Sequence, residues 1–495
     1  MSDAHAKNVS ALQGLGLSES LADRLSNARI GVSTAGSPTG SLALMADAVG
    51  DLLGRQWNCI DVTGPISDIV VAAATSAAAS GERDVQIAQR WAPPYDAVVN
   101  VGPPGADGNP TVSIVPTGWD VEARGAAIGA DDNPVGAAAA AALAAIDCFE
   151  QVFAAETASR SSRVESGWRW SAWNLGAPEQ GPPPGPLHFA DVCVAGVGAV
   201  THGLLWILER WPAPITGTLH LIDPDRYDPS NGQRYVGMRA DDLGGWKAEA
   251  ARDRIKLAHP ELDVQAYNVG MNEYVASLRP DAHLPLVVAG LDSKDARRQL
   301  AAKLPRRVVN MWTEREHLGA SRHGIGDGWR CLYCAYPDDV TEAPDELVLL
   351  VGETGILPRR VRELLDSGAG ITAEDAAAVS GRSGVPVEPL VGRPLRSVRA
   401  QLCATGAIQS GTTSEEVTVP FPFSSLLAGI VGWSELVREI EGISSDPYSW
   451  TIDVFHPPKP GHRWSVGPRP GCWLCSDALT FDVMAAKYGG TPTDS

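Results

Sequence analysis

The chain has 495 residues, of which 44% are hydrophobic and 20% charged, and its formal net charge is −19. Such an acidic balance argues against a general binder of nucleic acid or of anionic membranes, because both need a basic footprint. The longest apolar run, residues 135–146, is shorter than the about 20 residues of a spanning helix, and the first residues lack an apolar signal core, so we expect a cytoplasmic protein.

The first part of the chain alternates between strand-like and helix-like segments. Residues 28–33 are predicted to form a strand, which a glycine-containing loop joins to an amphipathic helix over 41–53. Two further strands are predicted at 57–62 and 97–101, and the alanine-rich segment 136–153 is a strong helix former. Strands that alternate with helices indicate a mainly parallel sheet.

The second part repeats this order. A strand is predicted at 191–195, then a glycine loop and a helix at 204–210, and two further strands lie at 218–222 and 286–290. We therefore expect an α/β protein with two doubly wound, Rossmann-like halves that arose by duplication. The alternative is that any two Rossmann-like units look similar.

Composition marks the boundaries of the predicted domains. A Pro/Gly-rich segment separates the two halves, and a charged helical stretch separates two Cys-x-x-Cys pairs. The predicted parts are a first Rossmann-like domain at 1–155, a linker at 156–188, a second at 189–337, a helical insertion at 338–415, a return to the second domain at 416–488 and a tail at 489–495.

The glycine loop of the second half has features of a nucleotide site. The sequence GVGAVT starts at Gly196 and opens a helix, so Gly196 and Gly198 let the backbone approach phosphate groups at a helix N-terminus. Asp223 ends the next strand, where a carboxylate suits a ribose. Thr201 replaces the third glycine of the usual fingerprint. These residues alone would fit an NAD-dependent oxidoreductase equally well.

The loops that follow carry charges for which an oxidoreductase has no role. Asn231, Arg234 and Lys247 lie after Asp223, and Asp292 follows the strand predicted at 286–290. In an open α/β sheet such loops line the ligand crevice. Arg234 and Lys247 are suited to neutralise a triphosphate, and Asp292 to hold Mg²⁺. The alternative is a set of surface charges beside a glycine loop.

The run D-x-D-x(5)-N-x-x-R, then K, then L-D-x-x-D-A-R, resembles the adenylation domain of the ubiquitin-activating / MoeB / ThiF superfamily. The resemblance covers about residues 191–300, and the cysteines extend it to about 477. It implies a ribose contact from Asp223, ATP-phosphate contacts from Asn231, Arg234 and Lys247, and a magnesium ligand in Asp292. Departures are Thr201, Tyr235 where Gln is common, and Ser293 where Asn is common; none removes a charged group.

The resemblance also implies that the first half is an inactive copy of the second. The two copies would align Asp61 with Asp223, but neither N-x-x-R nor a lysine follows Asp61. In this family an arginine reaches the ATP site from the inactive half or from a partner subunit, and Arg24 and Arg29 are the candidates here, besides an arginine of a second copy. Arg297 and Arg298 are equally compatible with exposed helix positions.

Four cysteines form two knuckle pairs, which supply the ligand set of a tetrahedral structural zinc: Cys331, Cys334, Cys472 and Cys475. The pairs flank a variable segment, as they do in the family. The alternative is four buried or reducible thiols.

Cys403 lies between the pairs. In relatives that form a thioester the catalytic cysteine lies in this crossover region, and the alternative for Cys403 is a packed core cysteine. Cys59, Cys148 and Cys193 are expected to be core residues.

The resemblance predicts an ATP-dependent activating enzyme for a ubiquitin-like protein. A C-terminal glycine would be adenylated with Arg234, Lys247 and Mg²⁺, transferred to Cys403 as a thioester, and passed to a conjugating enzyme. The chain resembles bacterial members of antiphage operons, and it would work as a pseudo-dimer within one chain or as a homodimer. Alternatives are adenylation of a sulfur carrier or small peptide without a thioester, an NAD-dependent oxidoreductase, and a scaffold with a dead nucleotide pocket.

Overall fold

The structure is a computed structural model. It describes residues 10–13, 15, 17–18, 21–37, 40–102, 113–123, 132–157, 169–174, 181–278, 283–326, 328–336, 350–351, 353–383, 385–388, 390–395, 398–399, 419–443, 449–455, 463–464 and 467–489. The chain divides into two compact units, residues 1–336 with 418–495, and residues 337–417. Cys403 lies outside the described residues.

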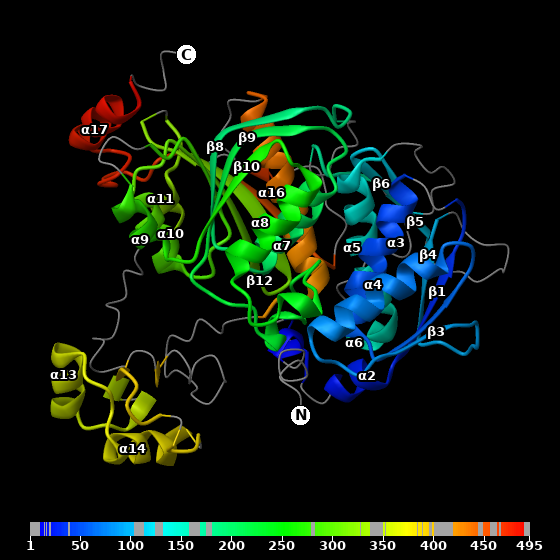
Figure 1. The fold of residues 1–495 in the computed structure, drawn as a ribbon, viewed down its shortest axis with the longest axis horizontal. Helices are drawn as coiled ribbons and strands as arrows, with labels where there is room; N and C mark the ends of the chain where they lie inside the picture. Colours follow the sequence, from blue (N-terminus) through cyan, green and yellow to red (C-terminus); the bar gives the residue numbers. More distant parts are fainter. Residues whose placement is uncertain are drawn as a thin grey trace. The chain divides into compact units, whose positions relative to one another are not determined.

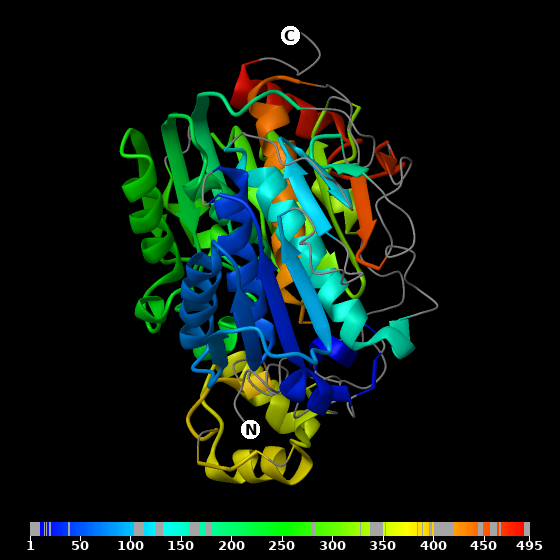
Figure 2. The ribbon, with the colours of Figure 1, turned by 90° about the vertical axis from the view of Figure 1, so that its right-hand side faces the viewer.

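The first half of the large unit is built on a seven-stranded sheet of order β3-β2-β1-β4-β5-β6-β7. Its strands are β1 (Arg29–Thr34), β2 (Cys59–Thr63), β3 (Gln86–Gln89), β4 (Ala97–Val101), β5 (Ser113–Thr117), β6 (Asp120–Ala123) and β7 (Arg169–Ser171). Its helices are α2 (Ala22–Asn27), α3 (Ser41–Gln56), α4 (Ser67–Ser80), α5 (Pro134–Val152) and α6 (Ala154–Thr157) (Figure 2).

The second half is built on an eight-stranded sheet of order β10-β9-β8-β11-β12-β13-β14-β15. Its strands are β8 (Leu187–Ala195), β9 (Ile215–Ile222), β10 (Leu262–Tyr267), β11 (Leu286–Ala289), β12 (Arg307–Glu314), β13 (His317–Gly324), β14 (Ser449–Asp453) and β15 (Arg463–Trp464). Its helices are α7 (Ala199–Glu209), α8 (Lys247–Ala258), α9 (Met271–Ser277), α10 (Lys294–Ala301), α11 (Leu332–Ala335), α16 (Pro422–Ile440) and α17 (Ala478–Tyr488), with short 3₁₀ turns η2 (Pro229–Asn231) and η3 (Ala240–Asp242) (Figure 1).

The two sheets share one topology. In each, five parallel strands are followed by antiparallel ones, and the first strand in sequence lies between the second and the fourth. This confirms two Rossmann-like α/β halves. The predicted alignment of Asp61 with Asp223 is wrong, because Asp61 lies within β2 and pairs with Gly31, whereas Asp223 follows the last residue of β9.

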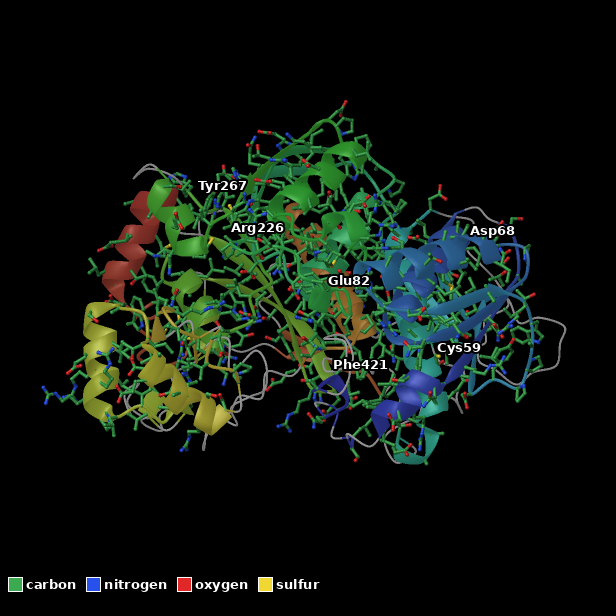
Figure 3. All side chains as sticks on the ribbon, turned by 60° about the horizontal axis from the view of Figure 1, so that its bottom comes forward. Cys59, Asp68, Glu82, Arg226, Tyr267 and Phe421 are labelled. Carbon is green, nitrogen blue, oxygen red and sulfur yellow. The ribbon has the colours of Figure 1, made fainter. Side chains whose placement is uncertain are left out.

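The two halves meet along three helices of the core. Helix α16 packs on α7 and also on α5 from the first half (Figures 1 and 2). Phe421, which precedes α16 and is labelled in Figure 3, lies 5.0 Å from Phe149 of α5, ring centre to ring centre. Helix α5 is long and apolar enough to cross a membrane, but 94% of its apolar window is buried inside the protein. It is a core helix, capped by the Asn133 side chain on the Val135 amide.

Among its described residues, the small unit includes the helices α13 (Pro358–Ser367) and α14 (Ala373–Ser383). They enclose a core of their own that includes Val361, Leu364 and Val379. Arg360 of α13 pairs with Asp375 of α14 at 3.0 Å, and Asp375 in turn accepts from the Thr372 amide at the start of α14. The buried apolar cluster and this ion pair explain why the charged, helical sequence forms a separate compact unit.

Candidate functional site

The predicted glycine loop lies where the order of the strands reverses. Strand β8 has β9 on one side and β11 on the other, and all three end at the same edge of the sheet. Gly196 has a φ of +87°, and a Cβ atom there would lie 2.9 Å from the carbonyl oxygen of Gly290, just after β11. Thr201, in place of a third glycine, donates its hydroxyl to the Gly196 carbonyl at 2.6 Å. The crevice at such a reversal is the usual ligand site of an open α/β sheet.

Asp223 is held beside this loop by two backbone amides. Its Oδ2 accepts from the Val197 amide at 2.6 Å, and its Oδ1 accepts from the Asp225 amide at 2.8 Å. The residue is only 5% exposed. Burial raises the pKa of Asp223, although Lys247 and the two amides oppose the rise. A carboxylate with spare lone pairs therefore borders the glycine loop, where it could accept hydrogen bonds from ribose hydroxyls.

Lys247 begins helix α8, and its ammonium is directed back to the loop after β9. Its Nζ donates to Asp225 at 2.9 Å and lies 3.4 Å from the Tyr235 hydroxyl. The side chain is 6% exposed. Burial alone lowers the pKa of Lys247, but the nearby Tyr235, Asp223 and Asp225 raise it above its usual value. Lys247 is thus a buried cation that stays charged at neutral pH.

Tyr235 lies close to both predicted cations and to the glycine loop. Its ring centre lies 5.4 Å from Lys247 Nζ and 5.3 Å from the guanidinium carbon of Arg234. Its hydroxyl is 3.9 Å from where a Cβ atom of Gly198 would stand. The residue that departs from the family pattern therefore connects the glycine loop with both cations. Sequence reasoning recorded Tyr235 as a departure and missed this position.

Asn231 and Arg234 lie on the turn that leads to Tyr235. The Asn231 Oδ1 accepts from the Asp228 amide at 3.1 Å, which closes a capping box on η2. Arg234 is half-buried and donates to the Ser230 carbonyl at 3.0 Å. Asp292 is exposed, two residues after Gly290 at the end of β11. The structure thus places Asp292 next along the same sheet edge.

The arginines named as candidates from the first half have partners within that half. Arg24 pairs with Glu156 at 2.8 Å, and Arg29 pairs with Asp61 at 3.1 Å. Among the described residues, Arg55 of the first half does reach the second half, and it donates to the Gly232 carbonyl at 2.6 Å. Arg55 depends on the packing of the two halves, and nothing in its local sequence distinguishes it.

Arg297 is not an exposed helix residue. It is 7% exposed, and its Nε donates to Asn310 Oδ1 at 3.0 Å. Arg298 is partly buried and pairs with Asp295 one turn before it on the same helix. Strand β12 therefore fixes Arg297, so its role is to join α10 to the sheet.

The four knuckle cysteines come together. Their sulfur atoms all lie within 4.8 Å of one another, with 3.8 Å between Cys331 and Cys472 and 3.3 Å between Cys334 and Cys475. Zinc–sulfur bonds of about 2.3 Å in a tetrahedron require sulfur separations of about 3.8 Å. The donor set fits a structural zinc.

Three other described cysteines were all predicted to be core residues, and two of them are. Cys148 and Cys193 are buried, and burial raises the pKa of Cys193 to about 12. Cys59 is half-buried at the start of β2. No nucleophilic role is indicated for these thiols.

Comparison with known proteins relates the part of the chain that contains the glycine loop to a known family. The model of the ThiF family matches residues 186–307. The chain is 32% identical to the uncharacterized protein y4jF of Sinorhizobium fredii over 369 residues, 72% of this chain and 70% of that protein. It is 27% identical to the tRNA threonylcarbamoyladenosine dehydratase of Haemophilus influenzae over 127 residues, 26% of this chain and about half (48%) of that protein.

Among solved structures, E. coli MccB with MccA-N7isoASN is similar, with 13% identity, 58% of this chain and 67% of that chain covered, and a TM-score of 0.37. The family match and the site residues coincide, because the glycine loop, Asp223, Lys247 and Asp292 all lie within 186–307. The chain therefore belongs to the ThiF family, within the superfamily of ubiquitin-activating enzymes, MoeB and ThiF.

Proposed function

We propose that this protein uses MgATP to adenylate the C-terminal carboxylate of a protein or peptide. The observation that carries the proposal is the gathering of Asp223, Arg234 and Lys247 around the glycine loop, with Tyr235 between the two cations. A buried carboxylate beside a phosphate loop suits a ribose, and two cations suit a triphosphate. An NAD-dependent oxidoreductase has no use for the cations.

Each site residue has a proposed role in binding ATP. Asp223 accepts hydrogen bonds from the ribose, and Gly196 and Gly198 let the phosphates approach the N-terminus of α7. Arg234 and Lys247 neutralise phosphate charge, with Asn231 as a further phosphate contact. Asp292 binds the magnesium that accompanies ATP, since Mg²⁺ commonly takes one or two carboxylates plus phosphate oxygens.

The proposed chemistry is an in-line displacement at the α-phosphorus. A carboxylate oxygen of the C-terminal residue forms a bond to the α-phosphorus, the bond to the bridging oxygen breaks, and pyrophosphate leaves. The products are an acyl adenylate and pyrophosphate. Arg234 and Lys247 stabilise the negative charge that builds up, and the rest of the contribution is alignment of the two reactants.

We further propose that the acylated residue is the C-terminal glycine of a ubiquitin-like protein. The Cys403 thiolate would attack the acyl carbon, AMP would leave, and the thioester would pass to a conjugating enzyme. Because the two halves already form one compact unit, the chain resembles a pseudo-dimer. The cysteine quartet would hold a structural zinc in its four thiolates. The second candidate remains adenylation without the thioester.

The test is ATP–pyrophosphate exchange on the purified full chain, with and without candidate ubiquitin-like proteins. Wild type is compared with Asp292→Ala and Cys403→Ala, and with Asp295→Ala as a matched control, because Asp295 is an exposed carboxylate three residues further on. We expect partner-dependent exchange that Asp292→Ala loses and Asp295→Ala keeps. A partner adduct that thiols cleave should be absent from both Asp292→Ala and Cys403→Ala, and only Cys403→Ala should lose the adduct while keeping exchange.

The outcomes separate the two candidates. Exchange without any adduct in the wild type would leave adenylation standing and reject the thioester step. Absence of MgATP binding in the wild type, measured by calorimetry, would reject the assignment of the site itself.

A further inference from the structure

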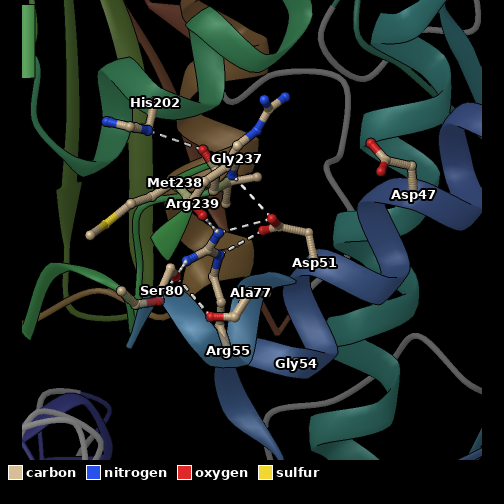
Figure 4. Close-up of polar contacts among 12 residues, drawn as sticks. Asp47, Asp51, Gly54, Arg55, Ala77, Ser80, His202, Gly237, Met238 and Arg239 are labelled. Carbon is tan, nitrogen blue, oxygen red and sulfur yellow. Dashed lines mark hydrogen bonds and ion pairs between the residues drawn. The ribbon is translucent and has the colours of Figure 1, made fainter. Parts of the chain in front are cut away.

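One loop of the second half is held at both ends by the first half. Residues 232–238 follow η2 and include Arg234 and Tyr235. Arg55, on α3 of the first half, donates from Nη1 to the Gly232 carbonyl at 2.6 Å and from Nη2 to the Met238 carbonyl at 3.0 Å (Figure 4). One side chain thus joins the start and the end of the segment that carries a proposed catalytic cation.

The Arg55 guanidinium is completely buried and uses all five of its donors. Besides the two loop carbonyls, it donates to Ser80 Oγ at 3.0 Å and to Asp51 at 2.6 and 2.9 Å. Asp51 Oδ2 also accepts from the Gly237 amide at 3.1 Å. A lysine has three donors on one atom and cannot reproduce this fork. The arrangement is therefore specific to arginine.

Two other contacts confine the same loop. His202 of α7 donates from Nδ1 to the Val236 carbonyl at 3.1 Å, from the helix that follows the glycine loop (Figure 4). The backbone of Gly81, at the end of α4, lies so close that a Cβ atom at Gly232 would be 2.5 Å from its Cα. The loop has little freedom to move while the two halves stay packed.

We propose that Asp51 and Arg55 are positioning residues of the ATP site, through which the first half holds Arg234 and Tyr235 in place for the triphosphate. The inference rests on the proposed function, because it assigns to the first half a part in binding the same nucleotide. The first half keeps no ATP-binding pattern of its own after Asp61. Its contribution is instead the buried ion pair that fixes the loop.

The variant to test is Arg55→Lys, with Arg83→Lys as its matched control. Arg83 also lies in the first half, but its donors go to the Gly54 carbonyl and to Asn58 and not to the two loop carbonyls. Arg55→Lys should raise the Kd and KM for ATP by about tenfold, because a small misplacement of a positioned group has large effects on binding and rate. The KM for the acylated partner should not change, and Arg83→Lys should resemble wild type.

Two further measurements distinguish positioning from general support. The first is hydrogen exchange of the amides of residues 233–238, which should quicken in Arg55→Lys and not in Arg83→Lys. The second is a double-mutant cycle with Arg234→Ala, in which Arg55→Lys should add no further loss if it acts through Arg234. A purely structural role would give additive losses of ATP affinity in the cycle and a rise in hydrogen exchange across the whole protein.

Each outcome decides the inference. Unchanged ATP affinity with unchanged loop exchange in Arg55→Lys would overturn it. If Arg55→Lys does not fold, Asp51→Asn keeps the side-chain shape and is judged by the same criteria. If the wild type neither binds nor exchanges ATP, the proposed function fails; the positioning of the loop is then judged by hydrogen exchange alone, and equal rates in Arg55→Lys and Arg83→Lys would reject it.

Discussion

Gly429 of α16 lies against Gly203 of α7 so closely that a Cβ atom at residue 429 would stand 2.4 Å from the Gly203 carbonyl carbon. The reverse is also true, since a Cβ atom at Gly203 would be 2.7 Å from the Ser425 carbonyl oxygen. Helix α7 carries the glycine loop at its start, and α16 is the segment that follows the small unit. The two glycines therefore set the distance between α16 and the helix that begins at the glycine loop.

Gly429→Ser should destabilise the large unit. The added side chain forces the two backbones apart, and overpacking of this kind costs about 1–3 kcal/mol. Gly270→Ser is the matched control, because a Cβ atom at Gly270 meets open space and serine is a favoured residue before a helix such as α9. Urea unfolding measures both. Equal free energies of unfolding for the two variants would mean that the crossing relaxes freely.

Lys247→Ala should lower ATP–pyrophosphate exchange by about 10²–10³-fold, the usual effect of removing one charge-stabilising group from an active site. Lys256→Ala is the control, since Lys256 is an exposed lysine on the same helix. The measurement is the exchange rate at saturating partner. A Lys247→Ala enzyme with wild-type exchange would remove this lysine from the mechanism.

Acid should destabilise the protein through His202. Burial beside Arg254 lowers the pKa of His202 well below its usual 6.5, so the folded protein holds the ring neutral. Below pH 6.5 the unfolded chain takes up a proton at this histidine that the folded chain does not, and the free energy of unfolding falls by up to about 1.4 kcal/mol per pH unit. The contribution is thus present above pH 6.5 and lost as the pH falls.

The check is urea unfolding between neutral and mildly acidic pH. His202→Gln should flatten the pH dependence, whereas His317→Gln, at an exposed site, should not. An unchanged slope in His202→Gln would assign the acid sensitivity to other groups.

The purified protein should contain one zinc per chain, bound by the four knuckle cysteines. Cys334→Ser should lose the metal, and a strong chelator should lower the Tm of the wild type, since binding free energy at a structural site contributes to folding. Cys59→Ser is the control, because Cys59 lies on the first sheet and outside the sulfur cluster. Metal analysis of protein prepared under reducing conditions that finds no zinc would favour the reducible-thiol alternative.

The glycine loop, Asp223 and Lys247 were predictable because each lies at an end of a regular element. A parallel sheet brings such ends to one edge, so short-range patterns were sufficient to place them together. Three strands of the first half were also predicted closely, as β1, β2 and β4, and residues 97–101 form β4 as expected; β3 and β5 to β7 were not predicted. In the second half, β12 and the antiparallel strands β13 to β15 have no such local signature and were not predicted.

Asp61 shows the limit of matching two halves by eye. The residues Val62 and Thr63 extend β2 beyond it, which puts the carboxylate in mid-strand. There it pairs with Arg29 at 3.1 Å and with Arg90 at 2.8 Å. A pattern of apolar residues does not reveal at which residue a strand ends. The apparent equivalence of Asp61 with Asp223 was therefore misleading.

Arg55 was beyond reach for a different reason. Its two loop carbonyls are 177 and 183 positions away, and a buried arginine in an amphipathic helix looks like a surface residue in the sequence. Arg297 is similar, because its burial depends on Asn310 of β12. Residues that act between packed elements are visible only once the packing is known.

Helix α16 also bears on the order in which the chain is made. Its first residue is number 422, yet it packs on α5 and α7, which end at Val152 and Glu209. A nascent chain released before that point leaves the apolar sides of both helices without their partner, and it also lacks Cys472 and Cys475 of the cysteine cluster. Domains generally fold as they leave the ribosome, from the N-terminus onward. Prematurely terminated products therefore expose apolar surface and become substrates for chaperones and proteases.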